Sequence, residues 1–226
     1  NLHSDLETLQ FAEQQEARLQ KEMTGLAVEN EEIGRLLHIS GFGVITAVTV
    51  YAAIGDIGRF VEPKKLVGYA GLGTRVHDSG MTTRTGKITK AGRRDLRVAM
   101  VEAAHVVANS HPHWKAELAR LQPRLGYNRA IVAIARKLLI TVWFVLQGKP
   151  DKYAEPEAVA QKMLKFAYTV GKDNRPGRQT AAQFARQRLD ALGLGQELTS
   201  IPWGSKKPIP LPPSMLGKKE SAVPNK

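Results

Sequence analysis

The sequence predicts a mainly α-helical protein, and three features of its pattern support this. Residues 2–38 place apolar side chains at heptad spacing, which is typical of a long coiled-coil helix. Residues 129–146 repeat Ile, Leu and Val at the period of a buried helix. Between them, residues 71–92 are rich in glycine, which favours an irregular loop or a short β-hairpin. We therefore expect a long N-terminal helix and a compact helical domain that carries this loop.

The heptad pattern of the N-terminal helix leaves three arrangements open. With Leu2 at an a position, Leu26 and Ile33 fall at d positions and Asn30 falls at an a position. An asparagine at a core position fixes the register of two-stranded coils, so one arrangement is a homo-oligomer formed through this helix. The second is an amphipathic helix that packs on its own domain, with Asn30 at the polar margin. The third is an antiparallel hairpin with a helix that residues 1–226 do not contain.

The charge is large and unevenly distributed. The 226 residues include 33 Lys and Arg against 21 Asp and Glu, a net charge of +12. Residues 1–38 hold eight acidic and three basic side chains, so the positive charge is concentrated after residue 38. This favours a polyanionic partner, with nucleic acid ahead of a membrane surface or a ribosome. No run approaches the roughly 18 apolar residues of a membrane span. Without cysteine, and without regular spacing of the histidines, no metal site is predicted.

A pair of glycines marks the entry to the helical domain. Gly41 and Gly43 lie two residues apart between helical segments, which favours a tight turn into the next helix. The free N–H groups of such a helix can hold a phosphate. This is typical of helix-hairpin-helix motifs, which contact the DNA backbone whatever its sequence. The alternative is an ordinary pair of helix-capping glycines.

The basic loop combines a hydroxyl group with many cations. Ser79 lies in an Asp-Ser-Gly turn sequence, and glycines at 80, 86 and 92 allow close approach to an anion. A hydroxyl nucleophile surrounded by guanidinium groups suits phosphodiester chemistry, because cations offset charge that develops on phosphoryl oxygens. The alternative is a solvated loop with a turn serine. The residues that we expect to contact DNA in and around this loop are Arg75, Arg84, Lys87, Lys90, Arg93, Arg94 and Arg97.

The remaining segments are assigned from their composition and periodicity. Helices are expected at 157–170 and 180–192, with Thr180 as the N-cap of the second. Trp114, Trp143 and Phe144 follow helical patterns and are expected in the core, and Val98 is expected on the apolar face of a helix over 96–107. The predicted divisions are a coiled-coil helix at 1–38, a DNA-binding domain with the candidate catalytic serine at 39–150, a helical extension at 151–200 and a flexible Pro/Lys tail at 201–226.

Ordered motifs along residues 39–146 resemble a known family. They are Gly41-Phe-Gly-Val-Ile-Thr-Ala47, Ile54-Gly-Asp-Ile57 with Phe60, Leu66-Val-Gly-Tyr-Ala-Gly-Leu72, Ser79-Gly80, Ile88-Thr-Lys-Ala-Gly-Arg-Arg-Asp-Leu-Arg97, Glu102-Ala-Ala104 and Val132-Ala-Ile-Ala-Arg-Lys-Leu138. In this order they resemble the C-terminal transposase domain of the IS110/IS116/IS902 family of bacterial insertion-sequence transposases. The family pattern often has a further glycine where this chain has Met81.

The resemblance implies a serine-dependent DNA recombinase whose active site is assembled from two domains. An upstream RuvC-like domain would supply carboxylates for a divalent metal, with Mg expected, and Ser79 would be the nucleophile. The partners implied are DNA and a guide RNA encoded by the element, in the bacterial cytoplasm near the nucleoid. Asp56, Asp78, Asp95 and Glu102 form no obvious cluster, so we expect the RuvC-like domain to be absent from this chain and no cofactor to bind in it. As an isolated fragment, the chain is then expected to bind nucleic acid without completing strand exchange.

A non-catalytic reading of the same residues stays open. A basic helix-hairpin-helix module that binds DNA or structured RNA through shape and charge would need the same glycines and cations but no nucleophile. It predicts strongly salt-dependent binding and no covalent adduct.

Overall fold

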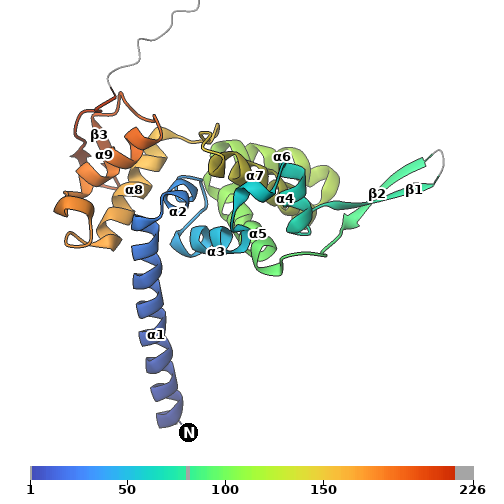
Figure 1. Cartoon of the computed structure of the whole chain (residues 1–226), viewed down its shortest axis with the longest axis horizontal. Helices are drawn as coiled ribbons and strands as arrows, with labels where there is room; N and C mark the ends of the chain where they lie inside the picture. The colour runs from blue at the N-terminus through green and yellow to red at the C-terminus, as the bar shows by residue number, and fades with distance from the viewer. Residues whose placement is uncertain (1, 80–81, 217–226) are drawn as a thin grey trace, which may run out of the picture. The chain divides into compact units, whose positions relative to one another are not determined.

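The computed structural model describes residues 2–79 and 82–216, with the backbone alone between 75 and 87. The chain divides into two compact units, Asn1–Tyr153 and Ala154–Lys226, and each is described by itself. The described chain is mainly helical, as the sequence predicts (Figure 1).

The N-terminal helical region contains a break. Helix α1 spans Leu2–Glu29 and α2 spans Glu31–Leu36. Asn30 lies between them with an extended backbone (φ −93°, ψ 117°), and its Oδ1 accepts the N–H of Ile33 at 3.0 Å. The prediction of one continuous helix over 2–38 is therefore wrong. Asn30 acts as an N-cap, because its side chain replaces the missing partner of a helix N–H group.

The two ends of the heptad pattern have different surroundings. Ile33 and Leu37 are buried within the first unit, which matches a helix packed on its own domain. Towards the other end, Leu2, Leu9 and Leu19 are 75%, 54% and 54% exposed. Figure 1 shows this part of α1 extending away from the other helices of its unit. Oligomerisation through the exposed stripe stays a prediction.

The core of the first unit is centred on one apolar helix. Helix α7, Tyr127–Leu146, packs against α4, α5 and α6. Trp114 of α6 is buried, and so are the six apolar residues of α7 that give the helical pattern, Ile131, Ile134, Leu138, Leu139, Val142 and Val145. Phe144 is 36% exposed and does not belong to the core. The other helices of this unit are α3 (Val44–Ile54), the short 3₁₀ helix η1 (Ile57–Arg59), α4 (Pro63–Tyr69), α5 (Arg94–Ser110) and α6 (Pro112–Leu125).

The glycine-rich segment forms a β-hairpin, which was one of the two conformations expected. Strands β1, Thr74–Ser79, and β2, Thr82–Ile88, pair antiparallel with Ser79 opposite Thr82. In Figure 1 the hairpin projects away from the helices that precede and follow it. A single pair of strands is marginally stable alone, so its geometry depends on how its base is held.

The second unit begins with the two expected helices. Helix α8 spans Pro156–Val170 and α9 spans Ala181–Ala191, with the 3₁₀ helix η2, Pro176–Arg178, between them. Thr180 is confirmed as the N-cap of α9, since its hydroxyl accepts the N–H of Gln183 at 3.2 Å. The Gln183 side chain in turn accepts the N–H of Thr180 at 2.8 Å. This reciprocal pair is a capping box.

A second β-hairpin occupies the start of the predicted flexible tail. Strands β3, Ser200–Trp203, and β4, Lys206–Pro210, pair antiparallel, and Ile201 is fully buried. The prediction is therefore wrong for this part of the tail, while residues 217–226 lie outside the described residues. Prolines are tolerated here because both strands of a two-stranded sheet are edge strands, where an N–H group can be dispensed with.

Candidate nucleic-acid interface

The β1–β2 hairpin is joined to the helices by a short ladder of backbone hydrogen bonds. The N–H of Thr89 donates to the oxygen of Gly73 at 2.8 Å, and the N–H of Lys90 donates to the oxygen of Gly71 at 3.1 Å. A third bond, 2.9 Å long, runs from the N–H of Arg93 to the oxygen of Tyr69. The ladder fastens the end of α4 to the start of α5. We call residues 69–73 and 89–93 the hairpin base.

Two glycines allow the strands of the hairpin base to approach each other. At Gly92 (φ +132°) a Cβ would lie 2.2 Å from the backbone oxygen of Tyr69. At Gly71 (φ +68°) a Cβ would lie 2.7 Å from the oxygen of Ala91. At both positions the backbone is left-handed and lies against the backbone of the other segment. Any side chain there would therefore force the two segments of the hairpin base apart. The need for glycine at position 92 thus comes from packing within the protein, while its expected closeness to an anion stays a prediction.

Arg97 reinforces the same base from α5. Its Nη1 donates to the backbone oxygen of Ala70 at 2.9 Å, and the side chain is half-buried. A hydrogen bond from a charged donor is stronger than one between neutral groups. Arg97, which was predicted to contact DNA, therefore links two segments of the protein itself, and its Nη1 is already used in this hydrogen bond.

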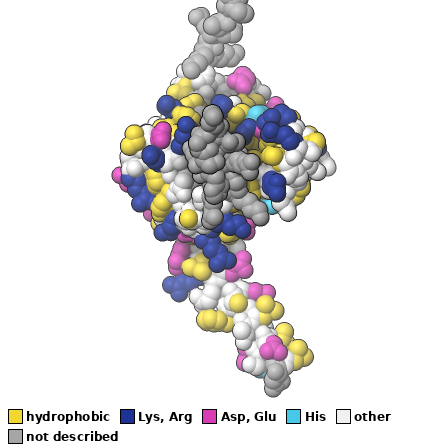
Figure 2. Space-filling view, turned by 90° about the vertical axis from the view of Figure 1, so that its right-hand side faces the viewer, with side chains coloured by type: hydrophobic (Ala, Val, Ile, Leu, Met, Phe, Trp, Pro, Cys, Tyr) yellow, Lys and Arg dark blue, Asp and Glu magenta, His cyan; other side chains and the backbone are white. Residues whose placement is uncertain are grey.

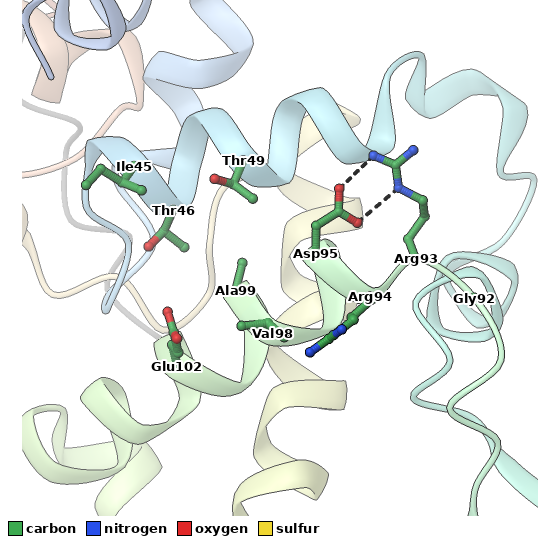
Figure 3. Close-up of a pocket in the computed structure, with 10 residues that line it drawn as sticks. All are labelled: Ile45, Thr46, Thr49, Gly92, Arg93, Arg94, Asp95, Val98, Ala99 and Glu102. Carbon is green, nitrogen blue, oxygen red and sulfur yellow. Dashed lines mark hydrogen bonds and ion pairs between the residues drawn. The ribbon is translucent and has the colours of Figure 1, made fainter. Parts of the chain in front are cut away.

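Arg93 and Asp95 form a two-pronged ion pair at the start of α5. Arg93 Nε lies 3.0 Å from Asp95 Oδ1, and Arg93 Nη2 lies 2.7 Å from Asp95 Oδ2 (Figure 3). Asp95 Oδ1 also accepts the N–H of Leu96 at 2.9 Å. The hydrogen bond from Arg93, followed by that from Leu96, lowers the pKa of Asp95, and the pKa of Arg93 is raised in turn. The guanidinium of Arg93 is thus partly neutralised before any ligand arrives.

Arg94 and Lys90 are more available than Arg93. Both side chains are exposed, and neither makes an ion pair with another described residue. In Figure 3 the Arg94 side chain extends away from the Arg93–Asp95 pair. Lys90 has a left-handed backbone, φ 54°, where the hairpin base turns towards α5. Among the predicted cations with described side chains, these two are the best placed to meet a phosphate.

A shallow groove of about 750 Å³ runs between α3 and α5. Ile45 and Val98 line it and are 54% and 46% exposed, so the apolar face predicted for α5 is open to solvent at Val98. Figure 3 shows the arginines at one end of the groove and Glu102 at the other. The sequence reasoning assigned no role to the two hydroxyl groups that line it, although Thr46 belongs to the Gly41–Ala47 motif. The lining residues are Ile45, Thr46, Thr49, Gly92, Arg93, Arg94, Asp95, Val98, Ala99 and Glu102.

The two glycines of the predicted helix-hairpin-helix turn have different surroundings. At Gly41 (φ +81°) a Cβ would lie 2.5 Å from Val107 Cγ1 and 2.9 Å from the oxygen of Ala103, so this glycine lets the turn pack on α5. Gly43 is exposed and caps α3 without a side-chain hydrogen bond, and a Cβ there would meet nothing within 4 Å. Helices lie on both sides of the pair, as expected. Phosphate binding by either glycine stays a prediction.

Arg59 is an exposed cation at the hairpin base that the sequence reasoning missed. Its guanidinium carbon lies 4.7 Å from the ring centres of both Phe60 and Tyr69, within the range of cation–π attraction. The Tyr69 backbone holds Arg93, so Arg59 and Arg93 flank the same residue. The Gly-Asp-Ile-Gly sequence before Arg59 was interpreted only as a helix break.

The hairpin separates Ser79 from the arginines that follow the loop. Ser79 ends β1, whereas Arg93 and Arg94 lie beyond the opposite end of β2. Strands rise about 3.3 Å per residue, so Ser79 lies roughly 20 Å along the ribbon from its base. The expectation that one loop wraps Ser79 in all of its arginines is therefore wrong for Arg93, Arg94 and Arg97. Arg75, Arg84 and Lys87 lie on the strands, and their side chains, like that of Ser79, are outside the described part.

Lys and Arg side chains are prominent on the side from which the hairpin projects. Figure 2 looks onto that side and shows them at several places, with hydrophobic and acidic side chains between them. Over the described residues, no group of three or more His, Cys, Asp or Glu side chains could hold a metal ion. No described helix is long and apolar enough to cross a membrane.

Comparison with known proteins finds similarity in part of the chain. Residues 34–119 match the family model "Transposase IS116/IS110/IS902 family". The chain is 34% identical over 131 residues to the transposase for insertion sequence element IS1111A of Coxiella burnetii, which covers 56% of this chain and 36% of that protein. It is 32% identical over 125 residues to a pilin gene-inverting protein of Moraxella bovis, covering 54% of this chain and 39% of that protein. The matched part thus spans less than half the length of each relative.

Proposed function

Because the chain carries a transposase domain of the IS116/IS110/IS902 family, we propose that it is the DNA-binding, nucleophile-bearing part of a DNA transposase or recombinase. The observation that carries this proposal is the β1–β2 hairpin. It holds Ser79 at the far end of a ribbon whose base is fastened to α4 and α5. Such a ribbon places the backbone of residue 79 well beyond the helical body, and we propose that the serine there reaches a phosphodiester in a bound duplex.

The proposed reaction is an in-line displacement at phosphorus. The Ser79 oxygen forms a bond to the phosphorus of a DNA phosphodiester, and the bond from phosphorus to the 3′ oxygen breaks. The serine proton passes to a base or to solvent, and the departing 3′ oxygen becomes a hydroxyl by taking up a proton. The product is a phosphoserine linked to a 5′ end. Because the covalent link keeps the phosphodiester energy, a 3′ hydroxyl of another strand can reverse the step.

The helical body would hold the DNA backbone while the hairpin reaches the reactive phosphate. Arg94, Lys90 and Arg59 are exposed cations around the hairpin base, and charge–phosphate contacts supply affinity without reading sequence. Gly43 opens α3 at the neighbouring groove, where its free N–H groups can meet a further phosphate. Arg97 acts on DNA indirectly, by fixing the base.

The resemblance also implies a divalent metal, expected to be Mg, and a guide RNA. The described carboxylates do not form a ligand set for a metal, since Asp95 is paired with Arg93 and Asp56 accepts the N–H of Gly58 at 2.7 Å. We propose that the metal is held by an RuvC-like domain outside the described residues, and that both this domain and the RNA are needed for strand exchange.

The test is covalent trapping with a full-length transposase that contains this chain. A suicide DNA substrate with a nick close to the cleavage site lets the product strand diffuse away, so the 5′ end stays attached to the protein. We expect the Ser79→Ala variant to form at least about a thousandfold less adduct, because the nucleophile is gone. Thr82→Ala, which alters the residue opposite on β2, is the matched control and should still form adduct.

Two results would refute the assignment of Ser79 as the nucleophile. One is wild-type adduct yield from Ser79→Ala. The other is the complete absence of adduct from the active wild-type enzyme, which would favour a basic module that binds DNA or structured RNA without cutting it.

A further inference from the structure

The second unit carries an exposed aromatic pair that the proposed function does not use. Tyr168, near the end of α8, is 52% exposed. Its ring centre lies 5.6 Å from that of the half-buried Trp203 on β3, with the ring planes inclined by 52°. Large aromatic side chains normally bury their rings, and Tyr168 instead leaves about half of its surface open to solvent.

Two lysines lie beside this aromatic pair. In the β3–β4 register, Lys206 is the partner of Trp203, and directly opposite residues place their side chains on the same face of a hairpin. Lys165 precedes Tyr168 by three residues on α8, so the two side chains share one face of the helix. Both lysines are exposed, and neither forms an ion pair with a described residue.

The helix and the hairpin that carry the two rings and the two lysines are fixed by packing and hydrogen bonds. Helix α8 packs against β3, and Ile201 of β3 is fully buried. The buried Arg186 donates Nε to the oxygen of Pro212 at 2.8 Å and Nη1 to the oxygen of Gly195 at 2.7 Å, on either side of the hairpin. The rings and lysines are thus presented by a braced hairpin and a helix, and little ordering would be needed on binding.

We propose that Tyr168, Trp203, Lys165 and Lys206 form a binding site for single-stranded nucleic acid. An unpaired base would stack on the open face of Tyr168, and the phosphates on either side of that base would lie near the two lysines. Base stacking on an aromatic ring tolerates any sequence, and the lysine charge complements the phosphate backbone. In a duplex the base faces are covered by their neighbours, so the site discriminates against paired strands. The proposal concerns the second unit and does not depend on Ser79.

The experiment measures binding of the full chain to labelled oligonucleotides of about 16 nucleotides by fluorescence anisotropy. The probes are single-stranded DNA, single-stranded RNA and duplex DNA of the same sequence. Tyr168→Ala should weaken single-strand binding about tenfold and leave duplex binding unchanged, whereas Tyr168→Phe, which keeps the ring, should bind like the wild type. An equal loss for duplex and single strand, or no loss with Tyr168→Ala, would overturn the proposal.

Charge and fluorescence provide two further readouts. Lys206→Gln should reduce the slope of log affinity against log salt by about 0.7, the value for one phosphate contact on a single strand. Arg178→Gln is the matched control, because Arg178 is an exposed cation of the same unit that lies 3.8 Å from Asp173, and its slope should not change. Single strands should also quench an emission component that Trp203→Phe lacks. An unchanged slope for Lys206→Gln, or equal quenching in Trp203→Phe, would contradict the site. Whether DNA or RNA binds more tightly identifies the natural strand.

Discussion

The two β-hairpins of this protein are similar in size and are held in different ways. β3–β4 keeps its shape through burial, with Ile201 fully enclosed and Leu211 just beyond β4 also buried. β1–β2 projects from its unit and is fastened at its base, where backbone bonds link Tyr69 to Arg93 and Gly71 to Lys90. A two-stranded sheet needs support from outside itself. β3–β4 obtains this support from the burial of Ile201 and Leu211, and β1–β2 obtains it from the backbone bonds at its base.

An arginine braces each hairpin by donating hydrogen bonds to backbone carbonyl groups. Arg186 is 3% exposed and donates to the oxygens of Gly195, Leu198 and Pro212, with Asp190 3.6 Å away. Arg97 is half-buried and donates to the oxygen of Ala70. Both belong to the positive charge that suggested a polyanionic partner, yet both bind the protein's own carbonyl groups. The charge available for nucleic acid is therefore smaller than the composition suggests.

Arg186→Met should produce the largest change in stability. The substitution keeps much of the side-chain volume but leaves backbone oxygens without their donors and Asp190 without its cation. Removing one partner of a buried charged network costs about 4 kcal/mol. We expect the second unit to unfold in a separate transition at lower urea concentration, detected by the Trp203 emission.

The control for this prediction is Arg178→Met, since the Arg178 side chain is 77% exposed and should change stability little. If the Arg186→Met protein melted like the wild type, burial alone would hold β3–β4, and the bracing role of this arginine would be refuted.

Gly92→Ala should have the next largest effect, and it tests how the projecting hairpin is held. A methyl group at position 92 would lie 2.2 Å from the oxygen of Tyr69, so the ladder of the hairpin base must open. Overpacking against backbone together with an unfavourable φ costs about 2 kcal/mol. We expect faster hydrogen exchange at the N–H groups of Lys90 and Arg93, measured by NMR, while the amides of α7 keep their protection.

Gly126→Ala separates the clash from the conformational strain. Gly126 also has a positive φ, +76°, but a Cβ there would meet nothing within 4 Å. If both variants loosened the hairpin base equally, a general loss of stability would explain the result, and the close approach at Gly92 would not be its cause.

The features that could be predicted from the sequence are those that depend on residues close together in the chain. The core of α7 and the N-cap at Thr180 depend on short-range patterns, and the structure confirms both. Asn30 fits a heptad core position and an N-cap equally well. Which of these two roles Asn30 takes depends on Tyr51 of α3, whose hydroxyl accepts a hydrogen bond from Asn30 Nδ2 at 3.1 Å. That contact between residues 21 positions apart has no local signature.

The candidate site was predictable in its residues but not in its arrangement. The basic segment was found from charge, and its hairpin was one of two expected conformations. The engagement of Arg97 could not be found in this way, because its partner is a carbonyl group 27 positions away. Arg93 pairs with a carboxylate two residues away, a spacing that does not bring side chains together on a helix and so predicted no contact. The β3–β4 hairpin was missed because proline-rich composition suggests disorder, whereas burial of Ile201 and the donors of Arg186 hold it in place.

Asp95→Asn should give the smallest change, and it concerns the cation beside the projecting hairpin. The Asp95 side chain is 48% exposed, so losing its pair with Arg93 should leave the overall stability almost unchanged. An Arg93 without its carboxylate can meet a DNA phosphate instead. We expect duplex DNA to bind about threefold more tightly and the salt slope to steepen by about 0.9, the value for one additional phosphate contact. Asp173→Asn, which alters an exposed acid 3.8 Å from Arg178, should change neither quantity.

The pH dependence of this variant gives an independent check on the pairing. The hydrogen bond from Arg93 lowers the pKa of Asp95 below its ordinary value of 3.8. A lowered pKa in the folded state means that the pair contributes its full stabilisation above pH 3.8 and loses it as the pH falls through the lowered pKa. The small difference in unfolding free energy between the wild type and Asp95→Asn should therefore be constant above that value and shrink below it. A difference that instead grew on acidification would mean that the carboxyl group is protonated more easily in the folded protein than in the unfolded chain, and Arg93 could not then be the partner that Asp95 holds back from DNA.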